Sequence, residues 1–335
     1  MKINSSTLHD LYHARQGHVS DKWSLYLDEY ERLFAPFRAS PIRLLEIGVQ
    51  NGGSLEIWRR YFPMARRLIG CDINPECHNI VYDDPKISVI VGDINNINTI
   101  KKIFGKSDSF DIIIDDGSHR SSDIVKTFAN YFHVLSDAGV YVTEDLHCSY
   151  WSEFEGGLYA PYSALSFFKR LADIVGQEHW GIRKSSSELL SGFSKHYGAT
   201  FDGVPFEHIH SVEFINSMCV IRKSLPANNR LGRRIISGST EQVTHSLLEM
   251  DSTISKPPIQ EKNLFSNMPM APDEAYFLLA AELGAKEARI NCLNAKMNAC
   301  EALLVRILMS WSWRMAWIFR KVGAVIRKVT RCSKM

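Results

Sequence analysis

Short apolar runs alternate with amphipathic stretches from the N-terminal region to about residue 224. Short runs rich in Ile, Leu and Val predict buried strands, and apolar residues spaced three and four apart predict helices. The five predicted strands cover residues 42–47, 67–72, 87–91, 110–115 and 139–143. Strands that alternate with helices predict an α/β fold with a Rossmann-like, doubly wound, mostly parallel sheet.

The segments around these strands complete the predicted domain. Helical spacing is seen in three segments, residues 7–36, 54–61 and 122–135. Residues 205–214 and 218–222 have the pattern of a closing hairpin, which brings the predicted sheet to seven strands. Residues 148–200 are less regular and rich in aromatic and small side chains. The pattern therefore predicts one domain over residues 1–224.

The chain changes character after residue 224. Residues 225–271 lose periodicity and are rich in Ser, Asn and Pro, which predicts a linker. In the tail, residues 272–335, apolar side chains follow a heptad pattern that only Lys286 interrupts. The heptad positions are Leu279, Leu283, Ile290, Leu293, Met297, Cys300, Leu304 and Ile307. This pattern predicts a coiled coil or helix pair, and so a homo-oligomer or a helical partner bound through residues 279–307.

The end of the chain has a strongly one-sided charge. No acidic residue follows Glu301, whereas basic residues continue to Lys334 and three Trp lie between residues 307 and 320. An aromatic and cationic helix suits the interface of an anionic membrane. The alternative is a helix that packs on a partner, or on the first domain, with a solvated basic end. Residues 307–335 are therefore candidates for peripheral contact with the inner membrane face.

The bulk composition narrows the function classes. The formal net charge of +2 gives no overall field that favours nucleic acid. Seven scattered cysteines without a Cys-x-x-Cys pair indicate a reducing compartment and argue against a disulfide framework or a zinc site. The N-terminal residues lack the apolar run of a signal peptide, and no apolar stretch reaches the ~20 residues of a membrane span. We therefore expect a cytoplasmic protein.

Glycines and acidic residues follow the predicted strands where a nucleotide-like cofactor binds. Gly48, Gly52 and Gly53 come directly after the first strand and let the backbone turn closely around a ligand. Asp72 ends the second strand, where an acidic residue binds ribose hydroxyls, and Asp93 follows the third. The alternative is a plain strand-to-helix turn with surface aspartates. The nicotinamide fingerprint G-x-G-x-x-G is absent.

Carboxylates end the fourth and fifth strands. Asp116, Glu144 and Asp145 can offer several oxygens to one hard cation such as Mg²⁺. His119 lies three residues beyond Asp116 and can accept a hydroxyl proton. Carboxylates at strand ends can also cap helices, and a histidine in such a turn can be a simple loop residue. Tyr150, Trp151 and Tyr162 are candidates for an acceptor-site wall, with the alternative that they are core residues, and His147 is a second candidate near the metal.

Several motifs in order give a resemblance to a known family. They are Asp21-Lys22-Trp23, LLEIGVQNGGSLEIWRRYFP, IGCDINP, FDIIIDDGSH and AGVYVTEDLHCSYW. Over residues 17–222 the chain resembles the metal-dependent sugar O-methyltransferases, which include macrolide-deoxysugar and rhamnosyl enzymes. Gln50-Asn51 departs from the glycine-richer loop of relatives, which leaves the contacts of the cofactor loop open.

The resemblance implies S-adenosylmethionine and Mg²⁺ as cofactors and assigns the site residues. It implies that His119 is the base and that Asp116, Glu144 and Asp145 are the metal ligands. The implied cofactor site consists of Glu46, Gly48, Gly52, Ser54, Asp72, Asp93 and Asp115, and Asp115 also orients its loop.

We hypothesise an O-methyltransferase that acts on a sugar hydroxyl in surface-polysaccharide or O-antigen biosynthesis. The tail supports this acceptor, because its Ser-Trp-Arg segment resembles the ends of bacterial surface-polysaccharide glycosyltransferases. One alternative is an O-methyltransferase of a secondary-metabolite glycoside. Another is a non-catalytic scaffold or regulator of glycan assembly that recruits partners through residues 272–335.

Overall fold

The computed structural model describes residues 6–332. The chain divides into two compact units, Met1–Glu274 and Ala275–Met335. The first contains the whole sheet, and the second contains most of helix α9 (Pro272–Met309) and helix α10 (Trp311–Cys332).

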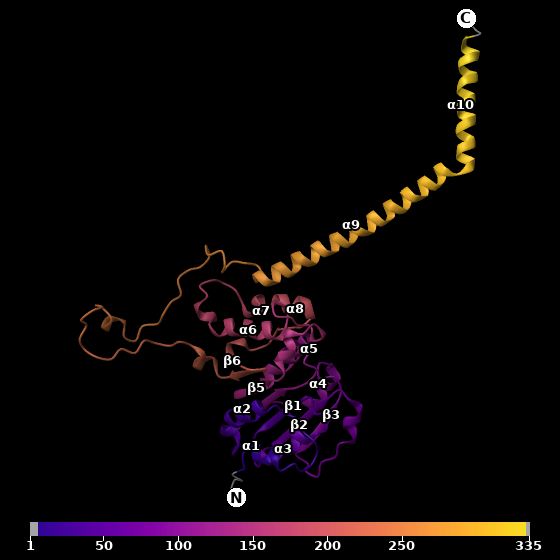
Figure 1. Cartoon of the computed structure of the whole chain (residues 1–335). Coiled ribbons are helices and arrows are strands. Elements are labelled where there is room, and N and C mark those ends of the chain that lie inside the picture. The colour runs from indigo at the N-terminus through magenta and orange to yellow at the C-terminus, as the bar shows by residue number, and fades with distance from the viewer. Residues whose placement is uncertain (1–5, 333–335) are drawn as a thin grey trace. The chain divides into compact units, whose positions relative to one another are not determined.

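One mixed sheet organises the first unit (Figure 1). Its strands are β1 (Arg43–Ile47), β2 (Arg67–Asp72), β3 (Ile87–Val91), β4 (Phe110–Asp115), β5 (Leu135–Thr143), β6 (Ile209–Ile215) and β7 (Met218–Lys223). They lie in the order β3-β2-β1-β4-β5-β7-β6. The first five strands are parallel, and β7 and β6 add an antiparallel hairpin. The predicted Rossmann-like, seven-stranded, mostly parallel sheet is confirmed.

Helices bury both faces of this sheet because alternate strand residues point to opposite sides. Leu44 and Ile112 pack in a core with α1 (Leu8–His13), α2 (Ser24–Phe34) and α3 (Gly53–Tyr61). Leu45 and Ile113 pack in a second core on the other face. The helices of that core are α4 (Ile97–Phe104), α5 (Ser121–Tyr131), α6 (Ala164–Val175), α7 (Ser186–Leu189) and α8 (Ser191–Tyr197).

The entry region differs from the continuous helix that its spacing predicts. Residues 14–23 separate α1 from α2 and contain left-handed backbone at Arg15 (φ 45°) and Gly17 (φ 83°). This segment is fixed to the start of α3, because the Gly53 N–H donates to the Val19 carbonyl (3.1 Å) and the His18 N–H donates to Glu56 (2.8 Å). Tertiary contacts therefore override the local helical pattern here.

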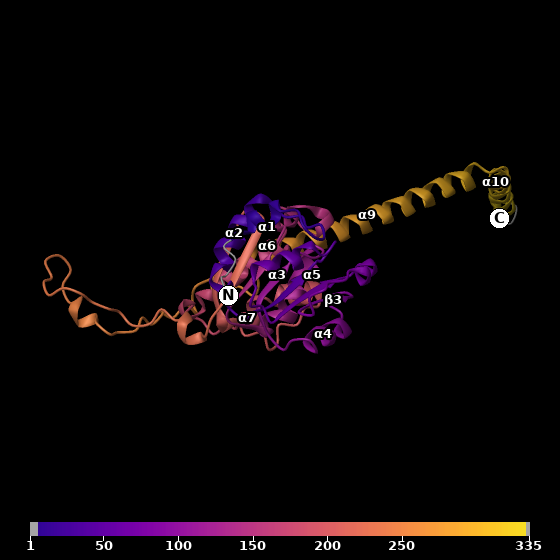
Figure 2. The same ribbon diagram turned by 90° about the horizontal axis from the view of Figure 1, so that it is seen from below.

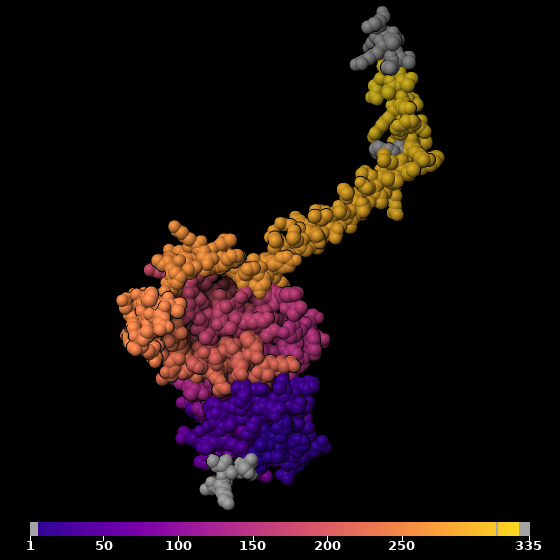
Figure 3. All heavy atoms as spheres, turned by 60° about the vertical axis from the view of Figure 1, so that its left-hand side comes forward, coloured from indigo at the N-terminus to yellow at the C-terminus, as the bar shows by residue number. Residues whose placement is uncertain are grey.

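Residues 225–271 are an irregular chain with two short 3₁₀ helices, Pro226–Asn229 and Leu248–Met250. Figure 2 shows this segment as an orange loop, and Figure 3 shows its atoms as orange spheres. The Lys184 ammonium donates to the Met268 carbonyl (2.8 Å), so the end of the segment is attached to that unit. The domain limits of 1–224 and 272–335 stay predictions.

The second unit consists of helix. Heptad residues such as Leu283, Ile290 and Leu293 are exposed along α9, and the pairing expected of them stays a prediction. None of the helices within residues 6–332 combines the length and apolar character needed to cross a bilayer. Residues 333–335, the end of the predicted membrane-contact tail, lie outside the described residues.

Candidate active site

A cavity of about 410 Å³ lies at the carboxyl ends of the central strands. Its wall is formed by residues 19–23 and by the loops that follow β1, β2, β4 and β5. Ligands of open α/β sheets bind in this position, because the loops after parallel strands meet there. The volume lies within the range of small-molecule sites.

The glycine loop after β1 forms one side of this cavity. Gly48 has φ 87°, and a Cβ at this position would lie 2.7 Å from the carbonyl carbon of Asp116 and even closer to its oxygen. One carboxylate oxygen of Asp72 accepts the N–H groups of Val49 (2.8 Å) and Gln50 (2.9 Å). Asp72 therefore fixes the loop while it lines the cavity.

Glu46 supports the loop from inside the fold. Its carboxylate is completely buried and accepts the Ser54 hydroxyl (2.7 Å) and the Trp58 indole N–H (3.2 Å). Burial raises the pKa of Glu46 above its usual value. The contact ties the end of β1 to the first turns of α3.

The predicted cofactor residues divide into two groups. Gly48, Ser54 and Asp72 line the cavity, whereas the other four are not part of its wall. Those four are Glu46, Gly52, Asp93 and Asp115. Gly52 accepts the Tyr82 hydroxyl (2.8 Å), and the exposed Asp93 accepts the Asn95 N–H (2.8 Å).

Asp115 is buried beside Tyr141, whose hydroxyl donates to it (3.4 Å). Burial raises the pKa of Asp115 to about 7. Asp115 directly precedes Asp116 and is not part of the cavity wall, and its orienting role stays a prediction.

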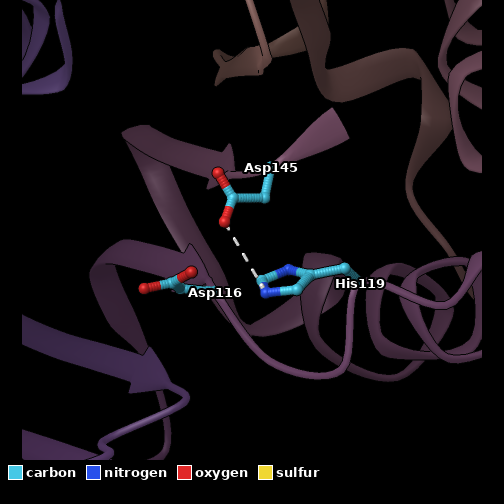
Figure 4. Close-up of side chains that lie close together, drawn as sticks. All are labelled: Asp116, His119 and Asp145. Atoms are coloured by element: carbon cyan, nitrogen blue, oxygen red, sulfur yellow. Dashed lines mark ion pairs between the residues drawn. The ribbon is translucent and has the colours of Figure 1, made fainter. Parts of the chain in front are cut away.

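A cluster of ligand groups forms the other side of the cavity (Figure 4). Asp116, His119 and Asp145 each offer one atom within 4.8 Å of the others, and the His119 Nε2 lies 3.7 Å from the Asp145 Oδ2. His119 (φ 58°) and Asp145 (φ 53°) have left-handed backbone. This conformation costs a non-glycine residue free energy and is found mainly where the surrounding structure imposes it, often at functional sites. Carboxylate oxygens are the donors that Mg²⁺ prefers.

Glu144 lines the same cavity but has a different set of neighbours from the one predicted. Its buried carboxylate accepts the Lys22 ammonium (2.8 Å) and the Tyr30 hydroxyl. Lys22 also pairs with Asp116. Burial alone lowers the pKa of Lys22, but attraction to Glu144 and Asp116 outweighs burial and raises that pKa well above its usual value. Glu144 therefore contacts a lysine and a tyrosine and is not one of the three residues of the ligand cluster.

Asp145 has one oxygen held and one directed at His119. Its Oδ1 accepts the Trp23 indole N–H (3.0 Å) and the Tyr26 hydroxyl (2.9 Å). The sequence motifs contain Lys22 and Trp23, but no role could be assigned from the sequence to these residues or to Tyr26 and Tyr30. The aromatic spacing along residues 23–34 resembles an ordinary core face, so no local signal distinguishes these hydroxyls.

Aromatic rings continue from the cluster along the outer surface. Trp23 and Trp151 are both about half exposed, and the His147 ring lies between them, with centroid distances of 6.3 and 5.1 Å. Tyr150 is half exposed as well. Tyr162 is buried and stacks on His196, so it is a core residue, and its assignment to an acceptor wall is wrong.

Comparison with known proteins agrees with this architecture. No protein-family model matches the chain. The chain is 37% identical over 167 residues to the 8-demethyl-8-alpha-L-rhamnosyl tetracenomycin-C 2'-O-methyltransferase of Streptomyces olivaceus, a match that covers 47% of this chain and 43% of that enzyme. It is 34% identical over 161 residues to the mycinamicin VI 2''-O-methyltransferase of Micromonospora griseorubida, covering 45% of this chain and 39% of that enzyme. The chain thus spans less than half the length of these curated relatives.

A solved structure is also similar. MycE methyltransferase from the mycinamycin biosynthetic pathway, in complex with Mg, SAH and mycinamycin VI, is 26% identical to this chain. The superposition covers 67% of this chain and 55% of MycE, with a TM-score of 0.55. The fold of the first unit is therefore the Rossmann-like methyltransferase fold.

Proposed function

We propose that this chain transfers the methyl group of S-adenosylmethionine to a sugar hydroxyl with the help of Mg²⁺. One observation carries the proposal. A single cavity joins a tight glycine loop, held by Asp72, to the cluster of Asp116, His119 and Asp145. Methyl transfer to a hydroxyl needs this combination, because a cofactor must lie beside groups that orient and deprotonate the acceptor.

The residues around the glycine loop fit a nucleoside-bearing cofactor. Gly48 permits close approach of a ligand, and Asp72 carries acceptor oxygens at the end of β2, where ribose hydroxyls are bound in this class of fold. Ser54 adds a polar group at the start of α3. We assign these three residues to cofactor binding.

The cluster fits a hard divalent cation. Asp116 and Asp145 supply oxygens, and Glu144 lies on the same wall with its oxygens on Lys22 and Tyr30. When bound, the cation supplies Lewis acidity that lowers the pKa of a coordinated sugar hydroxyl. The sugar oxygen then forms a bond to the methyl carbon while the carbon–sulfur bond breaks and the neutral thioether leaves.

His119 is the proposed acceptor of the hydroxyl proton. Its Nε2 lies 3.7 Å from the Asp145 Oδ2, and the residue lines the cavity in which the acceptor hydroxyl would bind. The left-handed backbone at His119 directs the ring into the cavity wall. Proton transfer by a positioned imidazole contributes a factor of about 10²–10⁴ to the rate.

The relatives support a small glycoside as the acceptor. The tetracenomycin enzyme is named for a rhamnosyl group, and the second relative is named for mycinamicin VI. None of the reported similarities supports the surface-polysaccharide or O-antigen role that the tail suggests, so we infer that the acceptor sugar belongs to a secondary-metabolite glycoside. The half-exposed Trp23 beside the cluster offers a flat apolar face on which a sugar ring can pack.

We infer that α10 binds the surface of an anionic membrane. Ile318, Val322 and Val325 recur at spacings of four and three and are exposed, so they form one apolar face. Arg314 and Lys321 flank this face, four residues before and three residues after Ile318, and the chain has no acidic residue after Glu301. Charge complementarity therefore favours anionic headgroups over an apolar or basic partner.

We also propose that the heptad stripe of residues 279–307 pairs with a second copy of this chain.

Asp116→Asn tests the proposed reaction. The variant of the whole 335-residue chain should bind S-adenosylmethionine and lose most transfer to a rhamnosyl glycoside, because the cation site is disabled and the glycine loop is intact. Asp83→Asn is the matched control, since Asp83 is an exposed aspartate outside the cavity wall. Full activity of Asp116→Asn with unchanged dependence on Mg²⁺ would contradict the assignment.

A further inference from the structure

We propose that one side of α2, together with the two residues before it, orients the carboxylates of the cation site. We call Lys22, Trp23, Tyr26 and Tyr30 the α2 stripe. Between them, their polar groups contact every carboxylate of the cluster. The inference rests on the proposed function, because it assigns these residues to the orientation of metal ligands.

The stripe arises from the geometry of the helix start. Tyr26 and Tyr30 are four residues apart, so their side chains lie on the same helix face. Trp23 is the N-cap residue and has extended backbone (φ −61°, ψ 144°). Its indole therefore reaches Asp145 together with the first-turn residue Tyr26. Both tyrosines and the stem of Lys22 are buried, so their polar ends have little freedom to turn elsewhere.

Two donors of the stripe select which oxygen of Asp145 faces the cavity. Trp23 Nε1 and the Tyr26 hydroxyl both lie on Oδ1, and Oδ2 is the atom nearest His119. The Tyr26 oxygen also accepts the Asp145 backbone N–H (3.0 Å), and it contacts the Ser217 hydroxyl at 2.9 Å. Backbone and side chain of Asp145 are thus fixed by the same tyrosine, which supports the left-handed conformation at that residue.

The other two members hold Asp116 and Glu144. These two carboxylates repel each other, and the Lys22 ammonium contacts both of them and offsets that repulsion. The Tyr30 hydroxyl donates to Glu144 from the buried side. The ligand groups are therefore oriented by α2 before any acceptor binds.

The effect of groups that orient metal ligands can be measured as a change in metal affinity, without catalytic turnover. Loss of one such contact typically lowers metal affinity by about 10–100-fold. We expect Tyr26→Phe to lower the affinity for Mn²⁺, used as a probe for Mg²⁺, by at least about 10-fold. Affinity for S-adenosylmethionine should change little, since Tyr26 is outside the cavity wall.

The experiment is calorimetric titration of residues 1–335 with Mn²⁺, accompanied by thermal unfolding of each variant. Trp23→Phe is a second test, because it keeps an aromatic ring and removes the N–H that contacts Asp145. Tyr61→Phe is the matched control, since the buried Tyr61 hydroxyl donates to a carboxylate elsewhere, Glu31 (3.0 Å).

The outcomes distinguish failure of the α2-stripe inference from failure of the proposed cation site. Weaker Mn²⁺ binding in Tyr26→Phe and Trp23→Phe, with native affinity in Tyr61→Phe, supports the inference. Native affinity in a folded Tyr26→Phe or Trp23→Phe would overturn it and leave the methyltransferase proposal intact. No Mn²⁺ binding by the unmodified protein would overturn the proposed cation site and this inference with it.

Discussion

Gly48→Ala is the substitution whose effect the geometry determines most sharply. The added Cβ would lie 2.7 Å from the Asp116 carbonyl carbon and 3.3 Å from the Cα of Gly117. Non-bonded carbons pack best at roughly 3.5–4 Å, so the loop and the end of β4 must separate by about 1 Å. The alanine would also have φ near 87°, which costs an L-residue about 1–2 kcal/mol.

This displacement affects both sides of the proposed site. The crowded atoms are backbone, so no flexible side chain can move aside, and Asp116 carries a proposed metal ligand. A misplacement of about 1 Å can lower a rate by about 10²-fold. We expect methyl transfer to fall by at least that factor, with weaker binding of S-adenosylmethionine.

Calorimetry of cofactor binding and a labelled-methyl transfer assay measure the two effects. Gly198→Ala is the control, because Gly198 has φ 67° and an added Cβ there would meet no atom within 4 Å. Gly198→Ala therefore has a similar backbone strain to Gly48→Ala but no steric overlap of the added Cβ. Native cofactor affinity in a folded Gly48→Ala protein would refute the argument that this loop approaches the ligand.

His119→Ala should lower kcat by about 10²–10⁴-fold while cofactor affinity in calorimetry is retained, and an unchanged kcat would exclude it as the base. Removal of divalent ions with a chelator should abolish transfer, and added Mg²⁺ should restore it. Replacing both Arg314 and Lys321 by Gln should lower the affinity for anionic vesicles, measured by co-sedimentation, by roughly 30-fold, because each charge contributes about 1 kcal/mol. Arg289→Gln in α9 is the control, and an unchanged affinity of the double variant would contradict membrane contact. Lys286→Leu removes the polar interruption of the heptads and should strengthen self-association in sedimentation equilibrium, and an unchanged monomer would argue against pairing.

The strands could be predicted closely because each central strand is buried on both faces. The bounds of β2 and β4 agree with the apolar runs, since a strand covered on two sides needs an uninterrupted apolar sequence. The break at Gly17 could not be predicted, because it depends on contacts with α3 far along the chain. Helix α6 was missed because its aromatic residues also fit an irregular core.

The site shows the same division between local and distant information. Asp116 and Asp145 follow strands directly, so strand prediction alone directs them to one edge of the sheet. The contacts of Lys22 and Tyr30 depend on how α2 packs against the ends of β4 and β5, and a tyrosine on a core face has the same pattern whether or not its hydroxyl meets a carboxylate. The neighbours of Glu144 could therefore be seen only in the fold.

The central claim is that the cavity between the glycine loop and the carboxylate cluster binds S-adenosylmethionine. Calorimetric titration of residues 1–335 with this cofactor, with and without Mg²⁺, tests it most directly. The account predicts micromolar binding by the unmodified protein and by Asp116→Asn, and strongly weakened binding by Gly48→Ala. The absence of binding by the unmodified protein in both conditions would contradict the account.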